Sequence, residues 1–117
     1  MSYTAAIERL GALAQELYTA PGKARRKFDL DQMRQLMRAL GNPQRDFSSI
    51  LIAGTNGKGS TAATLAKILT TAGYRTGLYT SPHLSRVNER IRLDGELIND
   101  EDFAKLFTQV EDAAAKL

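Results

Sequence analysis

The chain has 117 residues, 43% of them hydrophobic and 25% charged, with a net charge of +3, a composition typical of a globular domain. It has no cysteine and a single histidine, which excludes a disulfide framework, a cysteine nucleophile and a zinc site built from several Cys or His ligands. No apolar run approaches the roughly 20 residues of a membrane span and no secretory signal is visible, so we expect a cytoplasmic protein without membrane partners.

Two amphipathic helices are predicted near the N-terminus. Apolar side chains recur at helical spacing over residues 2–19, where Ser2 is a suitable N-cap and Pro21 follows the helix end. A basic loop follows, and a second helix opens at Asp29 or its neighbour. The sequence Gly41-Asn42-Pro43 should end that helix with a left-handed cap and a proline stop.

The pattern then changes to that of an α/β protein. Residues 49–53 form a short apolar run, which predicts a strand buried on both faces. A glycine-rich turn, a helix over 60–72 and a strand over 76–80 complete a predicted βαβ unit with parallel strands. Because such a sheet normally has more strands, we interpret the chain as part of a longer protein whose exposed strand edge favours self-association.

A hairpin and a last helix complete the predicted elements. Residues 90–93 and 96–98 flank Asp94-Gly95, a strong hairpin signal. Asn99 should cap a C-terminal helix that has three acidic residues in its first turn, where they suit the helix dipole. The predicted fold class is therefore α/β, with two leading helices, a βαβ unit, a short hairpin and a C-terminal helix.

The glycine-rich turn carries the clearest chemical signal. Glycines allow backbone N–H groups to converge on a phosphate, and a following helix adds the positive end of its dipole. Lys58 supplies a cation, and a hydroxyl of Ser60 or Thr61 can reach the phosphate or its Mg²⁺. The spacing departs from the usual phosphate loop, because Gly59 follows Lys58 where Ser or Thr is expected. The alternative is a glycine-rich turn with an incidental lysine.

Three motifs together resemble the folylpolyglutamate synthase and dihydrofolate synthase family, which is similar to the Mur peptide ligases. They are Gly54-Thr-Asn-Gly-Lys-Gly-Ser60, Gly77-Leu-Tyr-Thr-Ser-Pro-His-Leu84 and Asn88-Glu-Arg-Ile91. The resemblance covers nearly all of this chain but only the beginning of a two-domain family member. It implies a three-layer, Mur-ligase-like fold in which residues 1–117 are the N-terminal part of an ATP-binding domain.

The resemblance also implies an ADP-forming amide ligase of folate metabolism. In the family, a carboxylate of dihydropteroate or folate attacks the γ-phosphate of ATP, and the amine of L-glutamate then displaces phosphate from the acyl phosphate. A carboxylate is a poor electrophile until one oxygen becomes such a leaving group, so catalysis depends on positioning and on neutralising phosphate charge. The family takes further Mg²⁺ ligands and a second domain from later residues, so we expect this chain alone to be inactive.

The implied ATP and metal sites fall on the first two motifs. The phosphate-binding residues are Gly54, Thr55, Asn56, Gly57, Lys58, Gly59 and Ser60, with Lys58 as the catalytic contact to the β- and γ-phosphates. Ser81 matches the family's Mg²⁺-ligating serine, at a strand end where ligands of open α/β sheets bind. The alternative for Ser81 is a strand-end turn stopped by Pro82.

The implied pterin contacts precede the second helix. Phe28 could stack on the pterin, Asp29 could hydrogen-bond its amino-pyrimidine edge, and Leu30 completes the segment. The alternative is an Asp N-cap with a hydrophobic staple.

Three further side chains have open roles. His83 is better explained as a packed or hydrogen-bonded loop residue than as an acid or base, since the implied reaction needs no histidine base here. Arg86 and Arg90 could contact phosphate or substrate carboxylate, or could form structural ion pairs.

Two other functions stay open: a Mur-type cell-wall peptide ligase, and a non-catalytic nucleotide-binding module. The basic clusters lack interleaved aromatic residues and a basic stripe on a helix, so we expect no nucleic-acid partner.

Overall fold

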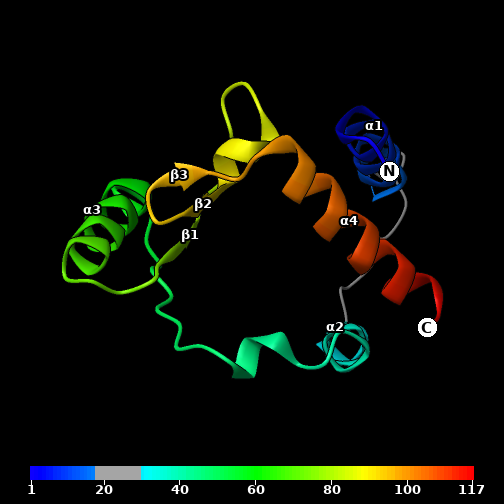
Figure 1. The fold of residues 1–117 in the computed structure, drawn as a ribbon, viewed down its shortest axis with the longest axis horizontal. Coiled ribbons are helices and arrows are strands. Elements are labelled where there is room, and N and C mark those ends of the chain that lie inside the picture. The colour runs from blue at the N-terminus through cyan, green and yellow to red at the C-terminus, as the bar shows by residue number, and fades with distance from the viewer. Residues whose placement is uncertain (18–29) are drawn as a thin grey trace. The chain divides into compact units, whose positions relative to one another are not determined.

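The structure is a computed structural model that describes residues 1–17 and 30–117, in two compact units (Figure 1). The first unit comprises Met1–Ser48 and Ala104–Leu117, and the second comprises Ser49–Phe103. No helix within the described ranges is long and apolar enough to cross a membrane.

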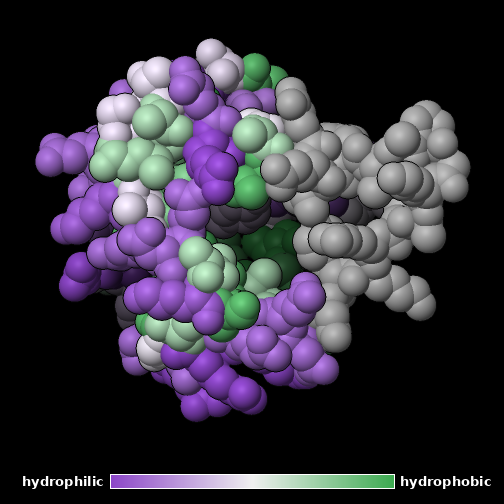
Figure 2. All heavy atoms as spheres, turned by 90° about the vertical axis from the view of Figure 1, so that its right-hand side faces the viewer, coloured by the Kyte–Doolittle hydropathy of each residue, from purple (hydrophilic) through white to green (hydrophobic). Residues whose placement is uncertain are grey.

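The first unit is helical. It contains α1 (Tyr3–Leu17), α2 (Leu30–Ala39), the 3-10 turn η1 (Pro43–Arg45) and most of α4 (Asp100–Ala115). An ion pair between Arg9 and Glu111 joins α1 to α4. The helices bury only part of their apolar surface: Leu106 and Val110 of α4 stay 49% and 42% exposed. Accordingly, Figure 2 shows hydrophobic and hydrophilic residues intermixed on one face of the molecule.

The predicted caps of the first unit are confirmed. The Ser2 hydroxyl accepts a hydrogen bond from the Ala5 N–H at 3.2 Å. At the end of α2, Gly41 and Asn42 both have positive φ, of 82° and 52°. The Gly41 N–H donates to the Arg38 carbonyl and the Asn42 N–H donates to the Met37 carbonyl. These two hydrogen bonds are the pattern of a Schellman cap.

The second unit contains one helix and a small sheet. These elements are α3 (Lys58–Thr71), β1 (Gly77–Tyr79), the 3-10 turn η2 (Val87–Arg90), β2 (Ile91–Leu93) and β3 (Glu96–Leu97). The sheet has the order β1-β2-β3, and both pairings are antiparallel. The predicted hairpin turn is confirmed, since Asp94 and Gly95 have φ of 51° and 86°, as a type I′ turn requires.

The predicted parallel βαβ unit is wrong for the described residues. Residues 49–53 belong to no strand, and β1 pairs with β2, which runs antiparallel to it. Ile50 is 65% and Leu51 93% exposed, so the apolar run is not buried on two faces. The physical reason is that a strand depends on hydrogen bonds from a neighbour, and no described segment pairs with this run.

The ends of α3 and the start of α4 follow the prediction more closely. After α3, Gly73 has a φ of 97°, and its N–H donates to Thr70 in the same type of cap as that of α2. The Asn99 side chain accepts the Asp102 N–H at 2.7 Å, which confirms it as the N-cap of α4. Ile98 and Phe103 on either side of this cap are buried, at 4% and 8% exposure.

Candidate functional site

The loop before α3 is shaped by its glycines. Gly57 is the N-cap of the helix with φ 76° and ψ 6°, and Gly54 has a φ of 152°; both values disfavour any residue with a Cβ. The helix begins at Lys58, earlier than the predicted start at residue 60. The whole segment from Gly54 to Ser60 is exposed. The sequence-predicted phosphate residues are therefore together at one surface.

Backbone donors at the start of α3 lie outside the helical hydrogen-bond ladder. The first bond within the ladder runs from the Thr61 N–H to the Gly57 carbonyl, at 3.0 Å. The N–H groups of Lys58, Gly59 and Ser60 precede it, and no side chain caps this end of the helix. Exposed donors at the positive end of a helix dipole are suited to an anion such as a phosphate.

The lysine of the loop lies back over the preceding glycine. A Cβ placed on Gly54 would come within 3.7 Å of Lys58 Cγ, so the aliphatic part of the lysine passes beside Gly54. A shallow hollow of about 430 Å³ extends along α3 from the same end. It is lined by Ser60, Thr61, Thr64, Leu65 and Ile68. Hydroxyl groups thus lie next to the exposed amides.

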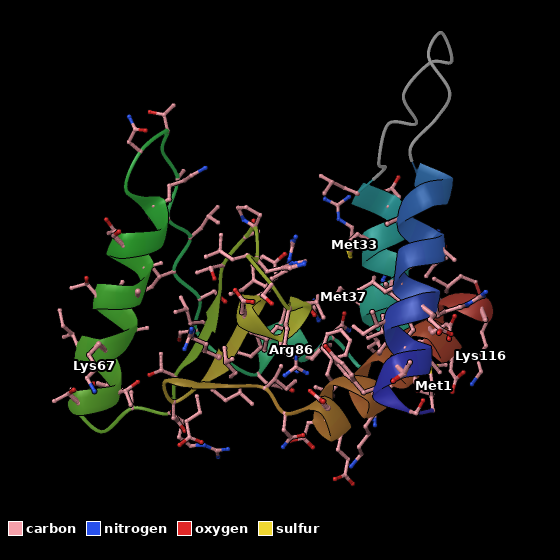
Figure 3. The ribbon with its side chains drawn as sticks, turned by 90° about the horizontal axis from the view of Figure 1, so that it is seen from above. Met1, Met33, Met37, Lys67, Arg86 and Lys116 are labelled. Atoms are coloured by element: carbon pink, nitrogen blue, oxygen red, sulfur yellow. The ribbon has the colours of Figure 1, made fainter. Side chains whose placement is uncertain are left out.

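Ser81 follows directly on the β1 strand and its neighbour Thr80. The chain reverses between α3 and β1, which pack together, so the start of α3 and the end of β1 point the same way (Figure 3). Ser81 follows β1, is exposed, and precedes Pro82 across a cis peptide bond. The role of Ser81 as a strand-end ligand stays a prediction.

The loop that carries Ser81 is closed by hydrogen bonds from η2. The Thr80 N–H donates to the Arg90 carbonyl at 3.0 Å. The Arg90 guanidinium donates from Nε to His83 Nδ1 at 2.7 Å. His83 is therefore a hydrogen-bonded loop residue, and Arg90 is one of its structural partners.

Glu89 binds the other half of this loop. Its carboxylate accepts the backbone N–H groups of Leu84, Ser85 and Arg86 at 3.1, 2.9 and 2.5 Å. These bonds, above all that from Arg86, lower the pKa of Glu89 below its ordinary value, because they stabilise the ionised form. No role was predicted for Glu89 from the sequence, although it lies in the third of the motifs that carry the resemblance.

A buried polar group joins η2 to the start of α4. Asn88 is 1% exposed, and its side-chain NH₂ donates to the Ile98 carbonyl at 2.9 Å and to Asp100 Oδ1 at 3.1 Å. Arg86 forms an ion pair with the same Asp100 carboxylate. Arg86 thus forms a structural ion pair, one of the two roles predicted for it from the sequence.

Of the predicted pterin contacts, Leu30 lies within the described residues. Phe28 and Asp29 lie outside the described residues, and Leu30, the first residue of α2, is 68% exposed in the first unit. Within residues 1–17 and 30–117, no group of three or more His, Cys, Asp or Glu side chains could hold a metal ion. Hydroxyl oxygens, which Mg²⁺ accepts as ligands, are present on Ser60, Thr61 and Ser81.

The chain resembles enzymes of known activity. It is 44% identical over 85 residues to the dihydrofolate synthase/folylpolyglutamate synthase of Bacillus subtilis, an alignment covering 73% of this chain and 20% of that protein. The structure of folylpolyglutamate synthetase from Lactobacillus casei is also similar, with a TM-score of 0.83 and 35% identity. The match covers 99% of this chain and 27% of the Lactobacillus casei chain. This chain is similar to one segment of the folylpolyglutamate and dihydrofolate synthases. The predicted resemblance and the Mur-ligase-like fold are confirmed.

Two further similar structures are nucleotide complexes. A folylpolyglutamate synthase complex with AMPPCP and folate matches with a TM-score of 0.80 and 36% identity. The Mycobacterium tuberculosis folylpolyglutamate synthase complexed with ADP matches with a TM-score of 0.80 and 34% identity. No protein-family model matches the chain. The chain spans about a fifth of the length of the Bacillus subtilis relative and about a quarter of the solved structures.

Proposed function

We propose that this chain is the phosphate-binding part of an ATP-dependent, ADP-forming ligase that joins L-glutamate to dihydropteroate or folate. The observation that carries the proposal is the exposed start of α3, where positive-φ glycines, unpaired helix amides and Lys58 converge. The similarity to a folylpolyglutamate synthase complex with AMPPCP and folate supports this choice of substrates. In this proposal, residues 1–117 are the N-terminal part of the ATP-binding domain of a two-domain enzyme.

The glycine loop would hold and neutralise the phosphates. The amides from Gly54 to Ser60 donate to phosphate oxygens, and Lys58 stabilises the charge on the β- and γ-phosphates while the substrate carboxylate attacks. An Mg²⁺ between the phosphates would be bound by the Ser81 hydroxyl, with Ser60 or Thr61 beside it. These side chains orient the γ-phosphate for in-line attack, which is the main contribution a protein makes to phosphoryl transfer.

The pterin would contact the segment before α2. Phe28 is proposed to stack on the ring, Asp29 to accept from its amino-pyrimidine edge, and Leu30 to add apolar contact. Leu30 is 68% exposed, so its side chain is accessible to a ligand. Substitution of Phe28 with Ala should raise the KM for the pterin substrate and leave the KM for ATP unchanged.

The test of the proposed function is ADP release by the intact protein that contains this chain. We expect release to require ATP, Mg²⁺, L-glutamate and either dihydropteroate or folate. Release that requires a cell-wall precursor peptide instead would assign the chain to the Mur-type ligases. Nucleotide binding without turnover on any of these substrates would assign it to the non-catalytic modules.

A further inference from the structure

The segment around Ser81 is attached to Arg90 on both sides. Before Ser81, the Thr80 N–H donates to the Arg90 carbonyl at 3.0 Å. After it, the Arg90 side chain donates from Nε to Nδ1 of His83 at 2.7 Å. The same guanidinium donates to the Tyr79 hydroxyl in a longer bond of 3.5 Å. The residues that flank Ser81 are therefore held by the backbone and the side chain of one residue.

The two attachments depend on different parts of Arg90. Tyr79 pairs with Ile91 in the antiparallel register of β1 and β2, so the bond between Thr80 and the Arg90 carbonyl continues the ladder of the sheet. That bond needs only the backbone of Arg90. The bond to His83 lies beyond the strands and needs the guanidinium. A substitution of Arg90 can therefore remove the second attachment and leave the first in place.

The chain has little freedom between the two attachments. Only Ser81 and Pro82 separate Thr80 from His83, and the proline ring fixes its own φ. His83 and Arg90 are half-buried, whereas Ser81 is exposed. A short segment that is held at both ends restricts the positions of the exposed hydroxyl, which lowers the entropy cost of binding a ligand there.

The contacts of the Arg90 side chain are confined to this segment. Within the described residues, Arg90 belongs to no ion pair, and its guanidinium donates to Tyr79 and His83. The bonds of Glu89 go to the later residues 84–86. The support of the Ser81 segment is therefore distinct from the support of the rest of the loop.

We infer that Arg90 is a positioning residue, which acts through His83 to hold the Ser81 hydroxyl where a nucleotide-bound Mg²⁺ can bind it. The inference rests on the proposed function, because it takes Ser81 as the metal ligand. Arg90 itself contacts neither metal nor nucleotide in this arrangement. Groups that hold a metal ligand from behind commonly affect metal affinity strongly, even though they do not touch the metal.

Two substitutions separate the hydrogen bond of Arg90 from its charge. Arg90→Met keeps the length of the side chain as far as the Nε position and removes both the donor and the charge. Arg90→Gln places a neutral N–H donor near the Nε position. The matched control is Arg92→Met, at a half-buried arginine within β2 that pairs with Leu78.

The measurement is the affinity of the intact protein for ADP and for AMPPCP, by calorimetry with Mg²⁺ and with EDTA. We expect Arg90→Met to reduce the gain in affinity that Mg²⁺ produces by about tenfold, the lower end of the usual effect of losing a partner behind a metal ligand. Arg90→Gln should stay within about threefold of the wild-type gain. Affinity in EDTA should change by less than about twofold, because Arg90 contributes nothing to the amides of α3.

Three results would overturn the inference. The first is an Arg90→Met protein with the full Mg²⁺-dependent gain. The second is an equal loss of affinity with and without Mg²⁺, which would indicate that Arg90 contacts the phosphates directly. The third is an Arg90→Gln protein as impaired as Arg90→Met, which would assign the effect to charge. Arg92→Met should match the wild-type protein in both conditions, and the same loss in this control also overturns the inference.

Nitrogen NMR of histidine-labelled protein tests the attachment without any ligand, with His83→Ala to identify the signals. A nitrogen that accepts a hydrogen bond carries no proton, so Nδ1 of His83 should report the Arg90 donor. We expect its signal to shift in Arg90→Met and to stay near the wild-type position in Arg90→Gln. An unchanged signal in Arg90→Met overturns the inference. A wild-type protein that shows the attachment but binds no nucleotide overturns the proposed function, and the positioning role with it.

Discussion

Two loops of the second unit are built in opposite ways. The loop from Gly54 to Ser60 is shaped by glycine backbone conformation, and the amides at its helix end lie outside the helical ladder. The loop from Ser81 to Arg90 is shaped by charged side chains, and Glu89 occupies three of its amides. The difference teaches that the loop 54–60, proposed to receive an anion (the receiving loop), keeps its donors exposed, whereas the loop 81–90, proposed to present Ser81 (the presenting loop), binds its own amides through a side chain.

The largest effect is expected from Lys58→Ala in the receiving loop. This change deletes a charge-assisted contact to phosphate, which is worth about 1.5–3 kcal/mol, so affinity for ATP with Mg²⁺ should fall about tenfold or more. Calorimetric titration measures it. Lys67→Ala is the matched control, because Lys67 lies towards the opposite end of α3 (Figure 3). Equal affinities of wild-type and Lys58→Ala proteins would contradict the phosphate assignment.

The next effect concerns the stability of the presenting loop. Asn88→Ala removes both donors of a side chain that is 1% exposed and leaves the Ile98 carbonyl without this partner. The free energy of unfolding should fall by about 1–3 kcal/mol. Asn56→Ala, at an exposed position of the other loop, should change it by less than about 0.5 kcal/mol. Urea denaturation compares the two, and similar losses would show that the loops do not differ in this respect.

A smaller loss of stability is expected from the backbone of the receiving loop. Gly57→Ala forces a Cβ into the left-handed region at φ 76° and should cost about 1–2 kcal/mol. Gly59→Ala, within the helix and with open space around its Cβ position, should be neutral or stabilise the protein by up to about 1 kcal/mol. Urea midpoints of both variants would distinguish the two glycines; equal midpoints would remove the distinction.

The smallest effect is a pH dependence confined to the presenting loop. The folded-state pKa of Glu89 is lowered, so its contribution to stability is complete above the unfolded-state pKa and is lost as the pH falls through the folded-state pKa. The difference in unfolding free energy between wild-type and Glu89→Gln proteins should therefore shrink on acidification. Urea titrations between neutral and acidic pH measure it. A difference that stays constant or grows on acidification would refute the role of the ionised carboxylate.

Sequence reasoning succeeded where structure is determined locally. The caps at Ser2, Gly41, Gly73 and Asn99 depend on a few neighbouring residues, and each is confirmed. The prediction of a strand over 49–53 was wrong. An apolar run indicates that burial is favourable, but it does not identify the segment that would cover the run. Glu89 was missed because its partners are backbone amides, which carry no signature in a sequence. The roles of the phosphate-loop residues and Ser81 remain predictions.

The bonds of Glu89 also decide which anions this surface can capture. Because the amides of Leu84, Ser85 and Arg86 already surround a carboxylate, chloride, phosphate or a substrate carboxylate in solution meets a site that is filled from within. No side chain caps the amides of Lys58, Gly59 and Ser60. In the proposed function, an incoming polyanion would therefore find open donors at the second of these two amide clusters and an internal ligand at the first.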